Sequence, residues 1–538
     1  MTLTRRVLLE RIGAAGGAGA AYMAMEALGL AIPTPVSAET FHLPRGSGNG
    51  KSVVILGAGI AGLVSAYQLQ LAGYRVKVLE AQTRIGGRVW TIRGGDRVVQ
   101  NGRPDQHAGF GAGLYFNSGA ARIPSTHRAI LGYARRFRVP MEVMVNTNRS
   151  AGWDLGGNVQ PERRMVNDVR GRLAELLAKA IDQHALDGEV AVGELEMIRQ
   201  FLAAYGELDA KGAYAPRGRS GYSVEGGAYS QAPVALPALS WRELLPGPAG
   251  SSRGSIAVPY FFEHIWDMQA TMLQPVGGMD RIAHAIYDRV KSLVRLGSPV
   301  TAIRRIGQRV RIEHGPGGQM TEADFCVCTL PMPVLARVPA DFSAAKKAAF
   351  LAAPYLGSVK VAFESPRFWE TDQSIYGGLA WTDRLNENVI YPSGGFNDEK
   401  GVLVAAYCAR WTNPQNPEAF ANLSHQERFQ ICRESVEALH PGRSKLLTKP
   451  VTVAWGLTPY AEGVGAVWPG GSAGISKRPP AYAELLKPEG PIVFAGEHLS
   501  YQPTWQEGAV LSAHEALRII GSMASESGGA ASQLASAR

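Results

Sequence analysis

The chain has 538 residues, of which 46% are hydrophobic and 19% charged, and its 55 Lys and Arg against 46 Asp and Glu give a net charge of +9. This composition excludes a mainly disordered chain and predicts two or three globular domains of about 100–200 residues each. The basic residues form no Lys/Arg block, which argues against nucleic acid as a partner, and no uncharged apolar run of about 18 residues follows residue 40, so we expect no membrane span in the mature protein.

The N-terminal residues 1–38 have the features of an export signal. Arg5 and Arg6 are adjacent, an Ala/Gly-rich apolar stretch follows, and the sequence VSA at 36–38 fits a cleavage site for small residues. This arrangement is typical of bacterial twin-arginine signals, so we expect an exported protein that is periplasmic or extracellular. A disordered N-terminal tail is the alternative interpretation.

The next segment predicts a strand–helix–strand unit. Residues 53–56 are continuous aliphatics, as in a strand that is buried on both faces. Leu63, Tyr67 and Leu71 follow with helical spacing, and residues 74–80 alternate in the manner of a second strand. The whole unit has the length of a βαβ motif with a parallel sheet.

The remaining chain changes character several times. Residues 125–205 are predicted to be helical, whereas residues 206–256 are rich in Gly, Ser, Pro and Tyr and predict a long loop or linker. Residues 257–335 mix helical and strand patterns, and residues 356–410 alternate as in an antiparallel sheet. The Ser/Ala/Gly-rich tail after residue 521 is expected to be disordered. The helical period in the first of these stretches is carried by Met165, Val169, Leu173, Leu176, Leu177 and Ile181.

A glycine motif lies in the turn of the βαβ unit. Gly57, Gly59 and Gly62 have the G-x-G-x-x-G spacing, which permits a tight turn and lets a pyrophosphate approach the free N–H groups at the helix N-terminus. Ala58 lies within the same turn. Glu80 follows at the end of the second strand, where a carboxylate accepts hydrogen bonds from ribose hydroxyls. Together these features predict a dinucleotide site.

A second glycine pair follows soon after that acid. Gly86 and Gly87 are flanked by Arg84 and Arg88, which suits a further close approach of backbone to a diphosphate or a flavin. An ordinary glycine turn with exposed arginines is the alternative. The four cysteines have no zinc-ligand spacing, and no metal site is predicted.

Four segments now resemble a known family, the flavin amine oxidases, which include monoamine, polyamine and L-amino acid oxidases. The segments are GAGIAGLVSAYQL, LEAQTRIGGRVWT, QPVGGMDRIA and FAGEHLSYQPTWQEGAVLSAHEAL, and they span nearly the whole mature chain in the family order. The resemblance implies an α/β fold of the GR2 flavoprotein type, with a Rossmann-like FAD-binding domain, a mixed-sheet substrate domain and a helical insertion.

The same resemblance implies the domain boundaries. The FAD-binding domain would be discontinuous, and the other parts would be threaded between its pieces. The expected parts are a signal peptide at 1–38, the FAD-binding domain at 50–115, 257–335 and 450–525, the substrate-binding domain at 116–130 and 336–449, the helical insertion at 131–205, the loop at 206–256 and the disordered tail at 526–538.

By resemblance, Val300 would meet the adenine, Glu497 the ribityl chain and the helix that starts near Gln506 the flavin pyrimidine edge. A helix N-terminus there would stabilise negative charge on the reduced flavin. The residues expected to contact FAD are Gly57, Ala58, Gly59, Gly62, Glu80, Ala81, Gly86, Gly87, Arg88, Ala121, Arg122, Val300, Trp455, Gly496, Glu497, Trp505, Gln506 and Ala509.

Arg122 decides which member of the family the chain is most similar to. Its segment, FNSGAARIPSTHRAI, resembles the G-x-M-R-x-P-x-x-H segment of L-amino acid oxidases, in which the arginine binds the substrate α-carboxylate. Ala121 departs from the methionine that is frequent there. Tyr391 matches the family tyrosine that is the second carboxylate donor. A surface arginine and a plain strand tyrosine are the alternatives.

The amine end of the expected site also differs from that of monoamine oxidases. Gly465 occupies the position of a cage tyrosine, which implies space for a longer substrate side chain, and Val464 replaces the cysteine that binds flavin, which implies non-covalent FAD. Trp505 would form the remaining aromatic wall, or else belong to the core, and the Thr504 carbonyl could accept from the substrate amine.

Two more family positions are identified by resemblance. Lys360 matches the lysine that reaches flavin N5 through a water molecule and assists the reaction with oxygen, and a solvent-facing lysine on an edge strand is the alternative. Trp455 matches an aromatic near the flavin, with a core tryptophan as the alternative.

The resemblance therefore implies an FAD-dependent L-amino acid oxidase that converts L-amino acids and O2 to 2-oxo acids, ammonia and hydrogen peroxide, in a homodimer. Lys360, Arg122, Tyr391 and Trp505 are the expected catalytic residues. A large apolar or aromatic side chain is favoured, and a basic one would require a carboxylate such as Glu462 or Glu507. An amide-forming L-amino acid 2-monooxygenase, a monoamine or polyamine oxidase, and a non-enzymatic flavin-binding protein remain as alternatives.

Overall fold

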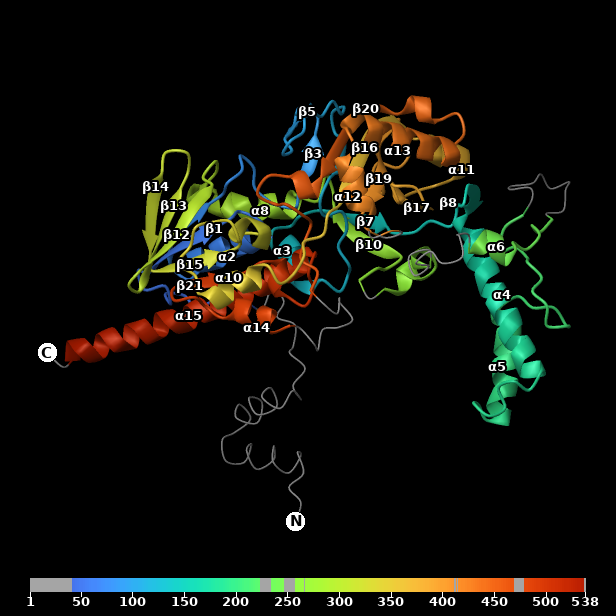
Figure 1. Ribbon diagram of the computed structural model, residues 1–538, viewed down its shortest axis with the longest axis horizontal. Coiled ribbons are helices and arrows are strands. Elements are labelled where there is room, and N and C mark those ends of the chain that lie inside the picture. The colour runs from blue at the N-terminus through green and yellow to red at the C-terminus, as the bar shows by residue number, and fades with distance from the viewer. Residues whose placement is uncertain are drawn as a thin grey trace, which may run out of the picture.

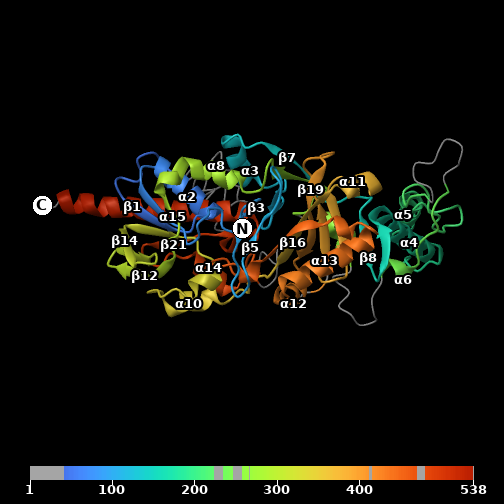
Figure 2. The same cartoon turned by 90° about the horizontal axis from the view of Figure 1, so that it is seen from above.

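The structure is a computed structural model that describes residues 41–222, 234–245, 257–265, 267–410, 413, 415–468 and 479–536. The predicted signal peptide and parts of the predicted loop at 206–256 lie outside the described residues. The described chain is elongated, with a parallel sheet and its helices toward one end, a larger sheet in the middle and a pair of helices that projects at the other end (Figures 1 and 2). None of the described helices is long and apolar enough to span a membrane.

The parallel sheet contains the predicted βαβ unit, which is confirmed: α2 (Ile60–Leu71) connects two neighbouring parallel strands. Strands from three separate stretches of the chain complete the sheet, and all neighbouring pairs are parallel. The strand order is β11 (Val294–Arg295), β2 (Arg75–Leu79), β1 (Ser52–Leu56), β15 (Phe325–Cys328) and β21 (Ile492–Phe494).

Both faces of this sheet are covered, because alternate residues of β1 enter two different cores. Val53 and Ile55 pack with the helices, whereas Val54 and Leu56 pack on the opposite side. Each fully buried aliphatic of this size contributes roughly 1.5–3 kcal/mol. The helical face is formed by α2, α3 (Arg128–Arg136), α8 (Arg281–Val290) and α15 (Gln506–Ser536). The opposite face carries β12 (Val300–Ile306), β13 (Arg309–His314), β14 (Gln319–Ala323), α9 (Met332–Leu335), α10 (Ala344–Phe350) and α14 (Pro480–Leu486).

The larger sheet has seven strands and is antiparallel except for the pair β17–β8. The antiparallel strands expected from residues 356–410 are confirmed in it. One helix on it, α13 (His425–Leu439), begins in a capping box of Ser424 and Glu427. The order is β20 (Thr448–Ala454), β16 (Val359–Pro366), β19 (Lys400–Cys408), β18 (Asn388–Tyr391), β17 (Gly378–Thr382), β8 (Gly152–Leu155) and β9 (Asn158–Pro161).

Short elements join the two large sheets. They include three two-stranded pairs, one of which brings residues 141–145 against residues 271–275. The pairs are β3 (Thr91–Arg93) with β6 (Tyr115–Asn117), β4 (Arg97–Val98) with β5 (Gln106–His107), and β7 (Met141–Val145) with β10 (Thr271–Pro275). The short helices are α6 (Trp241–Leu244), α7 (Val258–Phe261), α11 (Phe368–Gln373) and α12 (Asn416–Asn422).

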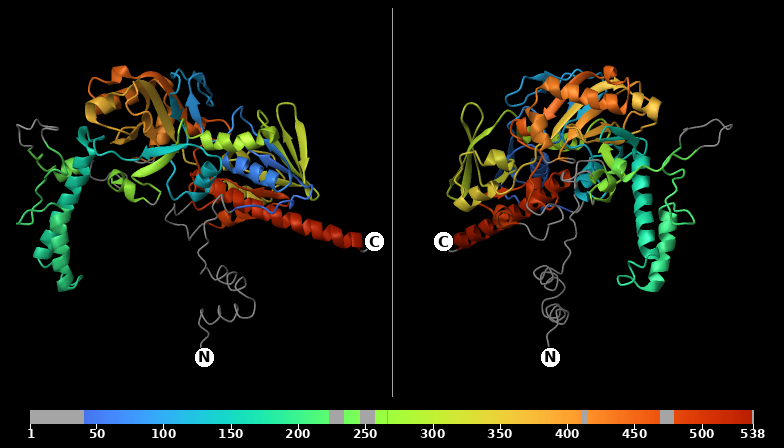
Figure 3. Two further views of the ribbon diagram at one scale, coloured as in Figure 1. Left: turned by 180° about the vertical axis from the view of Figure 1, so that it is seen from behind. Right: turned by 45° about the vertical axis from the view of Figure 1, so that its right-hand side comes forward.

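The prediction that residues 125–205 are wholly helical is wrong. β7, β8 and β9 occupy residues 141–161, and β8 and β9 extend the seven-stranded sheet. The two strands of the β8–β9 hairpin are joined at Gly156 and Gly157, both with positive φ, and glycine adopts that conformation without steric cost. The helices of this region, α4 (Glu162–Asp182) and α5 (Val192–Tyr205), pack on each other and project from the body (Figure 3).

The tail also differs from the expectation of disorder after residue 521. α15 continues to Ser536. Alanine is frequent in this stretch and has the highest helix propensity, which outweighs the Gly and Ser residues that suggested a flexible tail.

Candidate active site

A cavity of about 640 Å³ extends between the carboxyl ends of β1 and β2 and the face of the seven-stranded sheet. Most of the residues that were predicted to contact cofactor or substrate line it. These are Gly57, Gly59, Glu80, Ala81, Gly86, Gly87, Arg88, Ala121, Arg122, Val300, Lys360, Trp455, Gly496, Glu497, Thr504, Trp505, Gln506 and Ala509.

At one end, the glycine turn and Glu80 form the predicted dinucleotide site. Gly57 has φ +100°, and a Cβ on Gly62 would lie 2.0 Å from the carbonyl oxygen of Gly57, so neither position accepts a side chain. Gly59 opens on the cavity at the N-terminus of α2. The Glu80 carboxylate accepts from the Ala58 N–H (2.6 Å) and the Gln82 N–H (2.8 Å), which fixes it beside the turn. Ala58 and Gly62 support the turn without lining the cavity.

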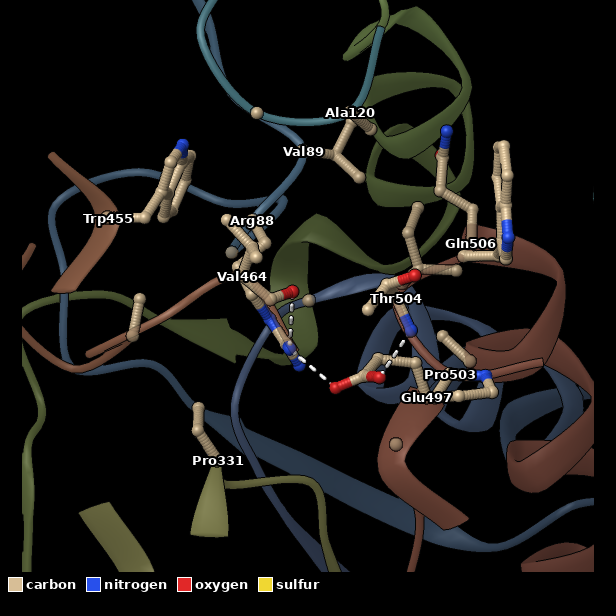
Figure 4. Close-up of a pocket in the computed structure, with 18 of the residues that line it drawn as sticks. Arg88, Val89, Ala120, Pro331, Trp455, Val464, Glu497, Pro503, Thr504 and Gln506 are labelled. Carbon is tan, nitrogen blue, oxygen red and sulfur yellow. Dashed lines mark hydrogen bonds and ion pairs between the residues drawn. The ribbon is translucent and has the colours of Figure 1, made fainter. Parts of the chain in front are cut away.

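Arg88 and Glu497 meet in the middle of the cavity (Figure 4). Arg88 Nη1 donates to Glu497 Oε1 (2.6 Å) and to the carbonyl oxygen of Val464 (3.1 Å), and Glu497 Oε2 accepts from the Thr504 N–H (2.6 Å). Burial by itself lowers the pKa of Arg88, but Glu497 raises it, and the net direction is upward. Arg88 therefore stays charged, and its contacts with Glu497 and Val464 hold three chain segments together.

The N-terminal turn of α15 presents unused hydrogen-bonding groups to the cavity. The side chain of Gln506 is 8% exposed, yet its amide oxygen and nitrogen have no partner among the described residues. Buried polar groups of this kind are normally satisfied. A ligand with donors and acceptors along one edge, such as a flavin ring, fits these two atoms, and with the glycine turn the cavity fits the whole of FAD.

The opposite end of the cavity contains a buried cation, Arg122, that has no acidic partner in the described part of the chain. Arg122 is 6% exposed, and its Nη1 donates to Asn146 Oδ1 (2.5 Å) and contacts Met268 Sδ (3.8 Å). Within the described residues no carboxylate forms an ion pair with it. Burial lowers the pKa of Arg122, and the adjacent Tyr407 counteracts this effect. A buried guanidinium with no counter-charge is costly unless an anionic ligand pairs with it.

Lys360 and Tyr407 are cross-strand neighbours on β16 and β19 and face this cation. Lys360 Nζ donates to the carbonyl oxygens of Gly119 (2.6 Å) and Asn117 (3.1 Å) and lies 4.8 Å from the Tyr407 ring centroid. Burial and then the charge of Arg122 lower the pKa of Lys360 to about 7. This lysine is buried, so it is not the solvent-facing residue of the alternative interpretation.

Trp505 forms the aromatic wall at this end. Its ring packs edge-on against His127, with 4.9 Å between the ring centroids, and His127 in turn lies beside Asp267. Thr504 adopts φ +71°, a rare backbone conformation for a residue with a Cβ, while its N–H is held by Glu497. The Trp455 indole donates to the Ser118 carbonyl oxygen (2.8 Å) and lines the cavity as well.

Two predicted site residues are not where the sequence suggested. Tyr391 is fully buried in the core of the seven-stranded sheet, where its hydroxyl lies 2.7 Å from His440 Nε2, and it does not line the cavity. Gly465 does not line it either, because a Cβ there would point at Thr504 Cγ2 (2.7 Å) and Glu497 Oε2 (3.0 Å). The glycine serves close packing, so the expected opening for a substrate side chain is not at this position.

Two residues of the site, Tyr407 and Asp267, carry no signal in the sequence that would have predicted them. Tyr407 faces Arg122 because β19 pairs with β16 in one register, and pairing between strands about 40 residues apart leaves no local signal. Asp267 lies in a short irregular segment next to Met268, where no motif marks it.

Comparisons with known proteins agree with this geometry. The family model described as flavin containing amine oxidoreductase matches residues 60–520. A flavin-dependent L-tryptophan oxidase of Lentzea aerocolonigenes is 26% identical over 499 residues, covering 87% of this chain and 98% of that protein. An L-amino-acid oxidase of Siganus canaliculatus is 28% identical over 478 residues, covering 86% and 83%.

Solved structures share the fold at lower identity. A cyclohexylamine oxidase from Brevibacterium oxydans has a TM-score of 0.57 at 18% identity and covers 88% of this chain and 99% of its own. A putrescine oxidase has a TM-score of 0.56 at 17% identity with the same coverage.

Proposed function

Because the chain belongs to the flavin-containing amine oxidoreductase family, we propose that it is an FAD-dependent L-amino acid oxidase. It would convert an L-amino acid, O2 and water to a 2-oxo acid, ammonia and hydrogen peroxide. The observation that carries the proposal is Arg122, a buried cation that has no acidic partner among the described residues and lies at the substrate end of the cavity. Curated relatives named L-amino-acid oxidase and L-tryptophan oxidase support it.

Arg122 and Tyr407 bind the substrate α-carboxylate in this account. The guanidinium supplies charge-assisted hydrogen bonds, and the Tyr407 ring lies 5.9 Å from the guanidinium carbon, so its hydroxyl is the second candidate donor. A substrate amine without a carboxylate would leave Arg122 buried and uncompensated. Carboxylate recognition therefore separates this chain from amine oxidases of the same fold.

The residues at the cofactor end hold FAD. The Gly57 turn and the N-terminus of α2 bind the pyrophosphate, Glu80 the ribose hydroxyls and Gln506 the flavin ring edge. Bound FAD would supply the chemistry of taking up a hydride from the substrate Cα and of delivering the electrons to O2. The chain orients the Cα–H with Arg122 and Tyr407, excludes water with Trp505 and holds the Lys360 ammonium near the reacting centre.

We expect FAD to be non-covalent. Val464 stands where a cysteine would bind the flavin, and the described residues that line the cavity include neither Cys nor His. Acid precipitation should release all of the yellow flavin into the supernatant.

Product analysis tests the proposal. With an apolar L-amino acid, the oxidase releases equimolar 2-oxo acid, ammonia and hydrogen peroxide. An amide with CO2 would identify a monooxygenase instead, and no product in the presence of bound FAD would identify a non-enzymatic flavin protein.

Residues 1–38 are proposed to direct export by a twin-arginine route. The support is the Arg5–Arg6 pair, the apolar stretch and the small residues at 36–38. In a bacterial host, Arg5→Lys together with Arg6→Lys should retain the full-length protein inside the cell, whereas N-terminal sequencing of the exported wild type should begin near Glu39.

A homodimer is proposed as the assembly, with the α4–α5 arm as the contact. Each helix exposes apolar side chains, and monomers rarely leave such surfaces in water. Leu176→Glu with Phe201→Glu should convert a dimer to a monomer in light scattering, while a surface control such as Asp288→Asn should not. The exposed apolar residues are Leu173, Leu176 and Leu177 on α4 and Met197, Ile198, Phe201 and Tyr205 on α5.

A further inference from the structure

Residues 257–265 and 267–268 belong to a stretch of chain that reaches the substrate end of the cavity. Within it, Phe262 is buried with its ring 5.7 Å from the Arg122 guanidinium, and Met268 Sδ is 3.8 Å from Arg122 Nη1. Ile265, Asp267 and Met268 line the cavity. This segment therefore contacts the α-carboxylate end directly and contributes the surface that the rest of the substrate would meet.

Asp267 is the unusual member of this segment. Its side chain is only 15% exposed, and among the described residues its carboxylate Oδ1 lies 3.4 Å from His127 Nε2. That distance is longer than the usual range for an N–H···O hydrogen bond. A carboxylate in a mainly apolar cavity is unfavourable unless a charged or donor group pairs with it. The Asp267 carboxylate can therefore accept hydrogen bonds from a ligand.

The other acidic residues nearby are already engaged. Glu80 and Glu497 line the cofactor end, and both oxygens of each accept hydrogen bonds. Of the two candidates from the sequence, Glu507 accepts from the backbone N–H groups of Ala129 and Ile130, and Glu462 pairs with Arg337. Among the described lining residues, Asp267 is the carboxylate that remains available at the substrate end.

From these contacts we propose that Asp267 selects L-amino acids whose side chain ends in a cation, such as an ammonium or a guanidinium. The inference rests on the proposed function and names its substrate class. Arg122 takes the α-carboxylate, and Asp267 takes the charge at the other end. The apolar stem of such a side chain packs against Ile265, Met268 and Trp505, as long basic side chains do on apolar surfaces.

Among the described residues that line the cavity, Arg410 is a competing charge, because it would favour substrates with acidic side chains. Arg410 is exposed, whereas Asp267 is nearly buried. Charges in exposed positions discriminate weakly because water screens them. Asp267 is therefore the stronger determinant of the two.

Paired substrates provide the test. L-Lysine and L-norleucine differ in the terminal ammonium, so the ratio of their kcat/KM values measures recognition of that charge. We expect wild type to favour L-lysine by about tenfold or more, the size of one charged hydrogen bond, and Asp267→Asn to lose most of this preference while norleucine changes by less than about threefold. Asp288→Asn, an exposed acid on α8, is the matched control and should keep the wild-type ratio.

Each other outcome overturns a specific statement. A wild-type preference for L-norleucine, or an unchanged ratio in Asp267→Asn with full FAD content, overturns the inference alone. A preference for L-glutamate over both assigns selection to Arg410 and also overturns it. If no L-amino acid, norleucine included, yields peroxide, both the proposed function and the inference are overturned.

Discussion

Arg122 is the main candidate for substrate binding, because its guanidinium is buried and donates to an amide oxygen while it contacts a thioether. Arg122→Ala should lower kcat/KM for L-amino acids by about 10–150-fold, corresponding to the roughly 1.5–3 kcal/mol of a charged hydrogen bond. Steady-state peroxide assays measure this, with the exposed Arg128→Ala on α3 as the matched control. Equal turnover by the two variants would contradict carboxylate binding at Arg122.

Tyr407 and Tyr391 test the assignment of the second donor. Tyr407→Phe removes a hydroxyl from the cavity and should raise KM about tenfold, because a hydrogen bond to a charged group is lost. Tyr391→Phe removes a hydroxyl that pairs with His440 in the core and should instead lower the melting temperature with KM unchanged. The opposite pattern in kinetics and thermal melts would restore Tyr391 to the site.

Lys360 makes stability depend on pH. Its pKa in the folded protein, about 7, lies below the ordinary lysine value of about 10.4, so the unfolded chain binds more protons between these values. The contribution of Lys360 to the free energy of unfolding therefore rises as pH increases from about 7 to about 10. The Lys360→Met variant should have a higher free energy of unfolding than wild type below pH 7. This difference should decrease as the pH rises toward 10.

Urea unfolding of the flavin-free protein across that pH range measures the difference. Lys291→Met, an exposed lysine next to α8, is the control and should show no such trend. If the difference in free energy of unfolding between Lys360→Met and wild type is constant with pH, burial does not lower the pKa of Lys360.

The start of α3 depends on a side chain from another helix. Glu507, in the first turn of α15, accepts from the N–H groups of Ala129 (2.9 Å) and Ile130 (2.8 Å), which have no partner inside their own helix. Glu507→Ala should lower the free energy of unfolding by about 1–3 kcal/mol, since two buried donors lose their acceptor. Chemical denaturation checks this against Glu515→Ala, an exposed acid on the same helix, and equal stabilities would show that water replaces the cap.

Elements with a strong local pattern could be predicted, and those defined by distant pairing could not. The aliphatic run of β1, the glycine turn and the period of α2 are all local, so the βαβ unit follows from residues 52–80 alone. β8 is only four residues long, and what makes it a strand is its place beside β17, more than 200 residues later. The helical period of α4 was predicted, but three of its leucines face solvent rather than a core.

The site residues also fall into two groups, those that a local sequence motif predicts and those that depend on distant contacts. Glu80, Arg88 and Gln506 belong to sequence motifs, and the structure brings all three to one cavity. Tyr407 depends on the register of two strands, and the role of Gly465 depends on how closely Thr504 approaches it. Neither relation is encoded within a window of neighbouring residues, so one sequence placed the cofactor end better than the substrate end.

At the scale of the whole molecule, bound FAD should stabilise the folded chain. The cavity is lined by segments from residue 57 to residue 509, and a ligand that binds only the folded chain stabilises it by about 2.7 kcal/mol at a hundredfold excess over Kd. Removing the flavin should lower the melting temperature, and added FAD should restore it in a concentration-dependent manner. Riboflavin, which lacks the pyrophosphate and the adenosine, is the control and should restore little; equal rescue would contradict the site at the Gly57 turn.

Peroxide release from the purified protein tests carboxylate recognition in this cavity most directly. The substrates are L-amino acids, the matching D-amino acids and the matching amines that lack the carboxylate. We expect peroxide from the L-forms, with little from the other two, because only the L-forms place a carboxylate on Arg122 while they present the Cα–H to the flavin. Peroxide from the amines alone would contradict the account and assign the chain an amine substrate.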